Sequence, residues 1–165
     1  MANPLITVAQ IKNKSLINGN ADAQKLGIMI ERSQDLYLRE ILGKPFFDYL
    51  LAATTYTTPE QTLIDEYIFK FLMVRTEIEA CVHFNWDIRN KSVGASNDQY
   101  AQAGDWDSID KLKNDLNKQA YLYRNMLVVY LNDNLTSFPL YEQVCDALQE
   151  QTSFSQNITF SIARQ

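Results

Sequence analysis

The sequence predicts an all-α fold: a helical bundle of two long helices and shorter N-terminal helices, with an extended N-terminal arm and a strand-like C-terminal tail. Two segments carry this prediction, because residues 63–82 and 109–131 both place apolar side chains at steps of three and four. With 165 residues, 46% of them hydrophobic and 21% charged, the chain has the size and composition of one globular domain.

The N-terminal third predicts an arm followed by two helices. Residues 5–11 are expected to form a short strand or turn, and a break follows before a helix over residues 22–42. Gly43 then stands where a left-handed C-cap is required, and Pro45 opens a short helix that ends near residue 51. The apolar positions of the first helix are Leu26, Ile30, Leu36, Tyr37 and Ile41.

The central helix has a clear start signal. Thr58 is expected to cap it, Pro59 fits the first turn, and Gln61 completes a capping box. The apolar face that follows, up to about residue 85, is too wide for a helix that is buried on one side only. We therefore expect this helix at the centre of the bundle.

The last long helix has two unlike halves. It follows a long polar surface loop predicted over residues 90–106, and it runs from about residue 107 to about residue 132. Its first half has one apolar face, which includes Leu112, whereas residues 121–131 are apolar around almost the whole cylinder. Because that half must be covered on more than one side, a partner interface is predicted at Tyr121, Met126 and Val129.

The C-terminal tail differs from the helical part, so the chain divides into a helical domain over residues 1–135 and an extension over residues 136–165. Residues 139–148 are expected to form a short helix, and residues 157–163 alternate apolar and polar side chains at strand period. Such a strand would pair with the N-terminal arm or with another subunit or the portal. The interface predicted here consists of Phe154, Ile158, Phe160 and Ile162.

Catalytic or metal-binding chemistry is not expected. His83 is interpreted as a structural histidine, because it lies two positions from Cys81 on a helix and the two side chains point apart. Glu77 and Glu79 are interpreted as solvent-facing charges, and the cluster Asp105, Asp107 and Asp110 as favourable charges at a helix start. The sequence thus predicts a protein that is not an enzyme and has no cofactor.

Composition also restricts the partners. The net charge of −5 and the lack of a basic run disfavour a dedicated nucleic-acid binder. No apolar stretch approaches the length of about 20 residues that a membrane-spanning helix needs, and the N-terminus has no secretory signal pattern. We therefore expect no membrane association.

Three segments resemble a known family. Residues 37–51, YLREILGKPFFDYLL, and residues 58–68, TPEQTLIDEYI, are similar to the head-to-tail connector (adaptor) proteins of tailed bacteriophages, nearest to the form in crAss-like phages. Residues 112–131 are similar to the last long helix of that family. The resemblance covers about residues 5–135.

The resemblance implies a virion structural protein that forms a ring with itself, typically of about twelve copies. The ring would join the portal protein above to the tail or the next ring protein below, around the channel through which genomic DNA passes without sequence-specific binding. The location would be the head-tail junction of the virion, after synthesis in the host bacterial cytoplasm. Two alternatives stay open, namely another ring or tail-completion component of the virion and an unrelated helical protein-interaction module.

Deletion of residues 155–165 tests the predicted tail strand, whose apolar alternation has no certain partner within the chain. The shortened protein should keep its helical content, measured by circular dichroism, but assemble less well, measured by sedimentation. Unchanged assembly would remove the role assigned to this strand.

Overall fold

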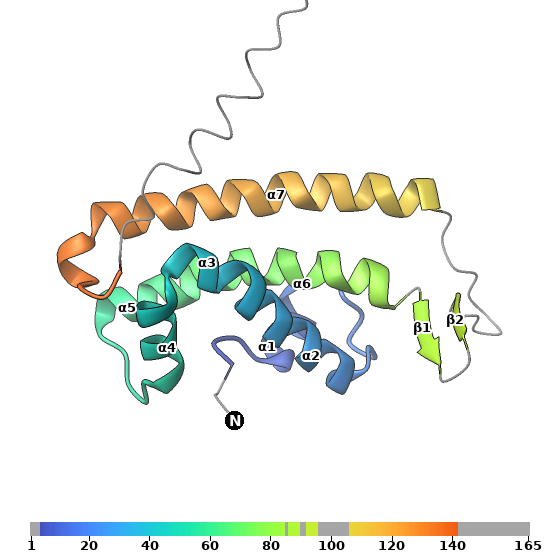
Figure 1. Cartoon of the computed structure of the whole chain (residues 1–165), viewed down its shortest axis with the longest axis horizontal. Coiled ribbons are helices and arrows are strands. Elements are labelled where there is room, and N and C mark those ends of the chain that lie inside the picture. The colour runs from blue at the N-terminus through green and yellow to red at the C-terminus, as the bar shows by residue number, and fades with distance from the viewer. Residues whose placement is uncertain (1–3, 85, 90–91, 96–105, 142–165) are drawn as a thin grey trace, which may run out of the picture.

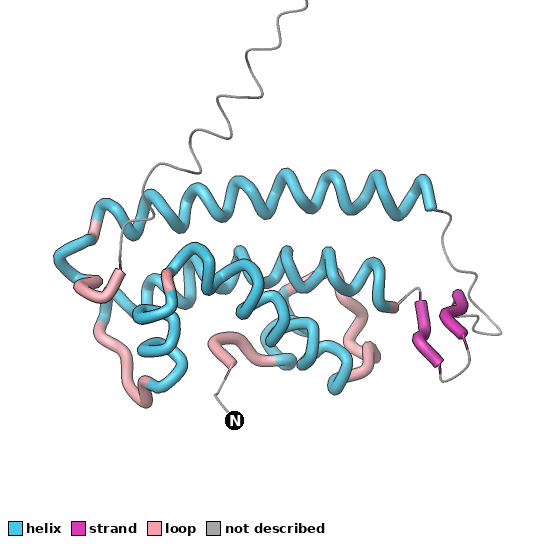
Figure 2. The backbone as a smooth tube through the Cα atoms, in the orientation of Figure 1, coloured by secondary structure: helices cyan, strands magenta, loops and turns pink. Residues whose placement is uncertain are grey.

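The computed structural model describes residues 4–84, 86–89, 92–95 and 106–141. Helices dominate this part of the chain, which confirms the predicted all-α fold class. The longer connections, over residues 15–22 and 53–57, lie mostly on the side of the molecule away from the last helix (Figure 2).

Two long helical rods lie side by side and run in opposite directions (Figure 1). One rod is continuous through α5 (Thr58–Thr62), the π-helical segment η2 (Leu63–Ile68) and α6 (Phe69–His83). The other is α7 (Trp106–Asp133), which confirms the helix predicted from about residue 107. The shorter helices cover the side of α6 away from α7, so α6 is central, as its wide apolar face indicated.

The N-terminal segment is helical, so the prediction of an extended arm with a strand or turn at residues 5–11 is wrong. α1 (Val8–Lys14) begins at a capping box. The Thr7 N–H donates to Gln10 Oε1 at 2.7 Å, and the Gln10 N–H donates to Thr7 Oγ1 at 3.2 Å. This local cap fixes the first helical turn and outweighs the apolar alternation, and Ile11 is then fully buried.

Two buried polar side chains hold the N-terminal segment against the rods. Gln34 Oε1 accepts from the backbone N–H of Leu5 at 2.8 Å, and Glu77 Oε1 accepts from the N–H of Leu16 at 2.9 Å. Glu77 is only 6% exposed, so its interpretation as a solvent-facing charge is wrong. The reason is that the segment after α1 covers this face of α6, and a buried carboxylate needs such a donor.

The helix predicted over residues 22–42 is confirmed as one continuous rod. Asp22 caps its start, where its side chain accepts from the N–H of Lys25 at 2.9 Å. The rod consists of α2 (Ala23–Ser33), the π-helical segment η1 (Gln34–Leu38) and α3 (Arg39–Leu42).

The wide turn of η1 changes which side chains face the core. Leu38 is fully buried, whereas Leu36, which the apolar pattern placed on the same face, is 54% exposed. A π turn closes hydrogen bonds five residues apart and so rotates the residues that follow it. Leu38 rather than Tyr37 therefore comes into line with Ile30.

Gly43 builds the corner between α3 and α4 (Lys44–Ala52), which confirms the predicted glycine turn. Its φ is 74°, but its ψ of 153° is extended, so the left-handed helical cap is wrong in detail. The Gly43 N–H donates to the carbonyl of Arg39, and its own carbonyl accepts from the N–H of Phe47, both at 3.0 Å. The extended ψ allows one residue to close one helix and open the next, in a conformation that only glycine adopts without strain.

The start of α5 lies one residue earlier than predicted. Thr57 rather than Thr58 is the N-cap, and the carboxylate of Glu60 accepts from the Thr57 N–H at 2.7 Å. Gln61, which was expected to complete the capping box, bonds instead to Asp65 one turn later. The charged carboxylate of Glu60 is the stronger acceptor for an N–H at a helix start.

A short antiparallel hairpin follows α6. It pairs β1 (Trp86–Arg89) with β2 (Ser92–Ala95), with Ile88 opposite Val93. The prediction of a loop over residues 90–106 is therefore wrong for β2, because β-branched residues such as Ile88 and Val93 favour strands. The other residues of that loop lie outside the described residues, apart from Trp106 in α7.

The core continues beyond residue 135, where the helical domain was predicted to end. A short 3-10 turn, η3 (Leu135–Ser137), leads to Phe138, which is 1% exposed and lies 5.6 Å from Phe46 between ring centroids. Residues 139–141 are not helical, and the rest of the helix predicted over residues 139–148 lies outside the described residues. The same holds for the strand predicted over residues 157–163.

The main core lies where α3, α4, η2 and the end of α7 meet. Its largest fully buried side chains include Phe46, Phe71, Phe138, Leu38, Leu42, Leu50, Leu63 and Ile68. A smaller cluster of Val74, Ile78, Leu116 and Ala120 joins α6 to the first half of α7. The two clusters together fasten α7 to the central rod along its length.

The Gly43→Ala variant should lose about 1 kcal/mol or more of unfolding free energy, because a Cβ is strained at this positive φ. Urea unfolding measures the loss. The matched control is Gly27→Ala inside α2, where a Cβ would meet nothing within 4 Å. That control should gain about 0.5–1 kcal/mol, and equal behaviour of the two variants would contradict the strain at the corner.

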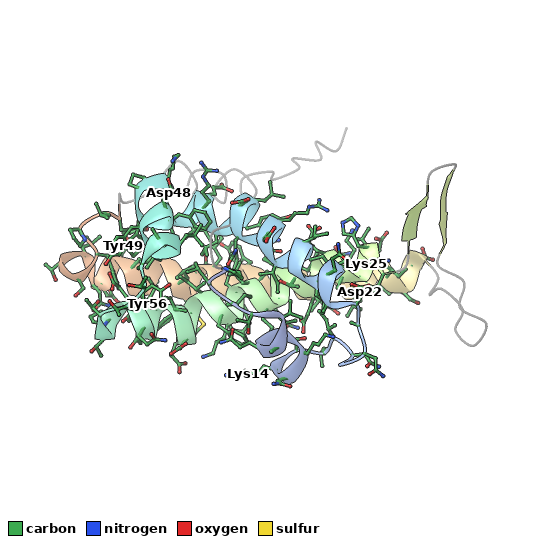
Figure 3. All side chains as sticks on the ribbon, turned by 90° about the horizontal axis from the view of Figure 1, so that it is seen from below. Lys14, Asp22, Lys25, Asp48, Tyr49 and Tyr56 are labelled. Carbon is green, nitrogen blue, oxygen red and sulfur yellow. The ribbon has the colours of Figure 1, made fainter. Side chains whose placement is uncertain are left out.

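Glu60 should make folding sensitive to acid. Burial acts to raise the pKa of Glu60, but hydrogen bonds from Thr57 and from the Tyr49 hydroxyl lower that pKa below its ordinary value of 4.5. Figure 3 shows Tyr49 near one end of the molecule. A lowered folded pKa means that the unfolded chain binds more protons, so this stability is present above pH 4.5 and is lost as the pH falls below it.

The measurement is the free energy of unfolding of the wild type minus that of Glu60→Gln, taken from pH 7 down to pH 3. The difference should shrink toward acid. Glu66→Gln is the control, since the Glu66 side chain is 60% exposed and pairs with Lys70 on the surface of the same rod. A difference that does not change with pH would show that the charge of Glu60 is not what the cap uses.

Candidate functional site

The outer face of α7 exposes three large apolar side chains. Leu122 is 61% exposed, Met126 is 50% exposed and Val129 is 57% exposed. Steps of four and three residues place them along one stripe of the helix, which we call the α7 outer face. The opposite side of the same turns is fully buried at Leu127 and Leu131. The second half of α7 is therefore apolar on two sides, of which its own core covers one.

Three of the predicted interface residues lie in the described part of the chain. Tyr121 is 47% exposed and stands beside the α7 outer face, while Met126 and Val129 belong to it. The structure thus brings the described members together on one stretch of α7. The other predicted interface residues, Phe154, Ile158, Phe160 and Ile162, lie outside the described residues.

Leu122 was missed by the sequence analysis and is the most exposed member of the α7 outer face. Its spacing to Met126 and Val129 was the available signal, but it identifies an outer face only when the core side of the helix is known. In the first half of α7, Leu112 is 48% exposed, although the apolar pattern placed it on the buried face. Ile109 and Leu116, seven residues apart, carry the packing there, because helical spacing turns Leu112 away from the line that they share.

A polar cluster joins α2 to α6. His83 Nε2 lies 2.9 Å from Arg32 Nη1 and 3.2 Å from Glu79 Oε2, and the Tyr37 hydroxyl donates to Glu79 at 3.5 Å. The Glu79 side chain is only 14% exposed, so its interpretation as a solvent-facing charge is wrong. Since Nε2 either accepts from Arg32 or donates to Glu79, the ring makes one of these two bonds in each tautomer.

The same cluster does not include Cys81. Burial, with the nearby charge of Glu77, raises the pKa of the Cys81 thiol above its ordinary value. A raised pKa disfavours the thiolate that nucleophilic chemistry needs. In the described part of the chain no group of three or more His, Cys, Asp or Glu side chains is arranged to hold a metal ion.

A second set of charged groups lies between α6 and α7. The Arg75 guanidinium lies over the ring of Tyr37 at 4.3 Å, and its Nη1 donates to Asn117 Oδ1 of α7 at 3.3 Å. Its Nε is buried and has no hydrogen-bond partner among the described residues. Burial lowers the pKa of Arg75 and the charge of Arg124 lowers it further, while Tyr37 and two nearby glutamates act to raise it.

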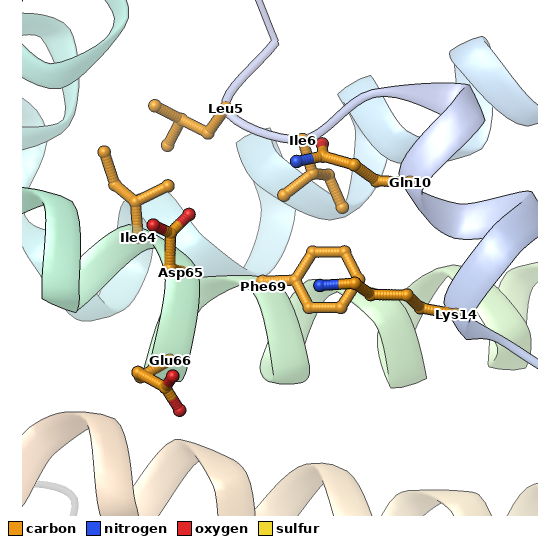
Figure 4. A pocket seen from close by; sticks show the side chains of 8 residues that line it. All are labelled: Leu5, Ile6, Gln10, Lys14, Ile64, Asp65, Glu66 and Phe69. Carbon is orange, nitrogen blue, oxygen red and sulfur yellow. The ribbon is translucent and has the colours of Figure 1, made fainter.

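One open pocket of about 300 Å³ lies between the N-terminal segment and η2 (Figure 4). At the pocket, Lys14 Nζ lies over the Phe69 ring, 5.1 Å from the ring centroid. The two carboxylates of the pocket, Asp65 and Glu66, already bond to side chains one turn away on their own rod. The lining consists of Leu5, Ile6, Gln10, Lys14, Ile64, Asp65, Glu66 and Phe69. These groups do not converge on a common point, so the α7 outer face remains the stronger candidate.

The fold and this surface define a small, mainly α-helical protein with an apolar helix face that the other described residues leave exposed. A family model matches residues 38–148, which is more than half of the chain, and the chain belongs to this family, described as a family of unknown function (DUF6712). No curated protein and no solved structure matches the chain. Among the described helices, none is long and apolar enough to cross a membrane.

Proposed function

We propose that the protein is a subunit of the head-to-tail connector ring of a tailed-bacteriophage virion. The resemblance of residues 37–51 and 58–68 to connector proteins is the source of this proposal. The order of elements supports it, because a glycine corner, a short helix and a capped long helix follow one another in the same segments.

The α7 outer face is the observation that carries the oligomeric part of the proposal. A helix that is apolar on two sides needs cover on both, and a second copy of the chain supplies it. Burying about half of each of three large side chains contributes about 1 kcal/mol apiece, or about 3 kcal/mol in all. A binding free energy of this size corresponds to a dissociation constant above about 1 mM. A single pair of copies is therefore unstable, and a closed ring is favoured because every copy in it makes two contacts.

The proposed neighbours are the portal protein above and the tail or next ring protein below. The net charge of −5 supports passage of genomic DNA through the ring without sequence-specific binding. The place of action proposed is the head-tail junction of the virion, after synthesis in the bacterial host. The protein acts by contact alone, without catalysis and without a cofactor.

The Met126→Glu, Val129→Glu double variant tests the proposal, because two carboxylates on the α7 outer face would need costly dehydration at a subunit contact. The wild type, co-expressed with the portal protein of the same genome, should form annular particles of about twelve copies in electron micrographs. The double variant should fold normally by circular dichroism but lose at least about tenfold in incorporation.

The matched control is Leu16→Glu in the segment after α1, a side chain that is 88% exposed against 50% for Met126. Incorporation of the control should stay within about twofold of the wild type if the effect belongs to the α7 outer face. A wild type that forms no annular particles, with or without the portal protein, would reject the connector function.

A further inference from the structure

The β1–β2 hairpin is a two-stranded sheet whose outer edges meet no other strand of the described residues. β1 follows α6 and contacts it, whereas β2 lies farther from the bundle (Figure 1). A hairpin of two strands is marginally stable in water, and a third strand with an apolar face makes such a sheet stable. The outer edge of β2 is therefore a place where a further strand would stabilise the protein.

The strand register gives the hairpin one apolar face. Trp86 pairs with Ala95, and Ile88 pairs with Val93. Because alternate residues of a strand belong to opposite faces of a sheet, these two pairs share one face, and Ser92 of β2 belongs to the other. A third strand that matches this sheet must have apolar residues at every second position.

Residues 157–163 have the sequence that such a strand requires. They read NITFSIA, with apolar residues at every second position, and residues 151–163 include no proline and no charged residue. Isoleucine, threonine and phenylalanine are residue types that favour strands. The N-terminal segment, one of the partners expected for this strand, forms the helix α1 instead, so among the described residues the hairpin supplies the strands with which it can pair.

The length of chain before this segment favours pairing with a second copy. Tyr141 lies beyond the end of α7 and packs near Phe46, with ring centroids 6.4 Å apart, whereas the hairpin lies at the other end of the bundle (Figure 1). α7 between these ends has 28 residues and is about 42 Å long. A random coil of about 16 residue steps, from residue 141 to residue 157, averages about 22 Å. Pairing within one chain would need a strongly stretched connection, which costs conformational entropy, but a neighbouring copy can bring its hairpin closer.

We propose that residues 157–163 of one copy pair with the outer edge of β2 in a second copy and extend its hairpin to a three-stranded sheet. Main-chain hydrogen bonds supply affinity, and the match of the two apolar faces sets the register. The inference deepens the proposed ring and rests on it for the presence of a second copy. Because the contact joins two different segments, each copy gives its tail to one neighbour and receives a tail from another, and such a linkage can close into a ring.

Disulfide cross-linking between two differently tagged full-length chains tests the contact. One chain carries Ser92→Cys in β2, and the other carries Thr159→Cys in the tail. Both positions belong to the polar face of the proposed sheet, where residues of adjacent strands have Cβ atoms about 5 Å apart. The chains are co-expressed with the portal protein, oxidised and separated on a non-reducing gel. A covalent dimer that carries both tags should form at least about fivefold more than in the controls.

Matched controls separate this contact from chance collisions. Leu16→Cys replaces Ser92→Cys at a side chain that is 88% exposed but belongs to the N-terminal segment, so little mixed dimer should form. Phe160→Lys, added to the tail chain, places a charge on the apolar face and should lower the mixed dimer at least about fivefold. Ser161→Lys places the same charge on the polar face and should leave the mixed dimer within about twofold.

The outcomes are distinguishable. Annular particles without the mixed dimer would overturn the strand contact and leave the ring proposal standing. A mixed dimer without annular particles would support the strand contact and reject the connector ring, and the absence of both would overturn both. If a disulfide forms only within one chain that carries both cysteines, the tail folds back on its own hairpin. If Ser92→Cys chains form dimers only with each other, the hairpins pair together. Either of these last two results overturns the proposal.

Discussion

The packing of the η2–α6 rod against α7 is the contact on which the rest of the structure depends. Leu116, Ala120, Leu127 and Leu131 of α7 are all at most 4% exposed in this contact. Ala120 allows close approach of the two rods, and Leu127 and Leu131 enter the main core. Because these side chains face inward, helix geometry makes Leu122, Met126 and Val129 face outward. The exposed face is thus a consequence of the core.

The same packing explains the unusual polar groups of α6. Because α7 covers one side of α6 and α2 covers another, polar residues of α6 are enclosed and must find partners across helices. Glu77 finds the backbone of Leu16, and Glu79 finds Arg32 and His83. Arg75 is different, because the side of α6 that it occupies meets aromatic rings and the neutral Asn117. Among the described residues, the buried Nε of Arg75 is therefore left without a hydrogen-bond partner.

Local signals in the sequence predicted most of the fold. Helix bounds follow from caps, glycine and apolar period, so these signals were enough to place the rods and the Gly43 corner. The errors come from features that local pattern does not encode. The π turn of η1 rotated Leu36 outward, and Glu77 became buried because a segment 61 positions away in the chain covers it. The exposure of Tyr121, Met126 and Val129 was predictable because a helix apolar all round cannot bury every side. The exposure of Leu122 and the surroundings of Arg75 could be predicted only by knowing which residues pack against each of them.

In the proposed ring, the position of the exposed apolar groups favours a directional contact between copies. α2 and η1 lie across α6 from α7, and they expose Ile28 at 52% and Leu36 at 54% (Figure 1). A two-fold contact between α7 outer faces would cover one side of each molecule and stop at two copies. A contact in which the α7 side of one copy meets the opposite side of the next covers both sides in every copy, and it closes into a ring when the rotation between copies allows. Because it would leave the least apolar surface in water, the directional contact is the arrangement that we propose for the ring.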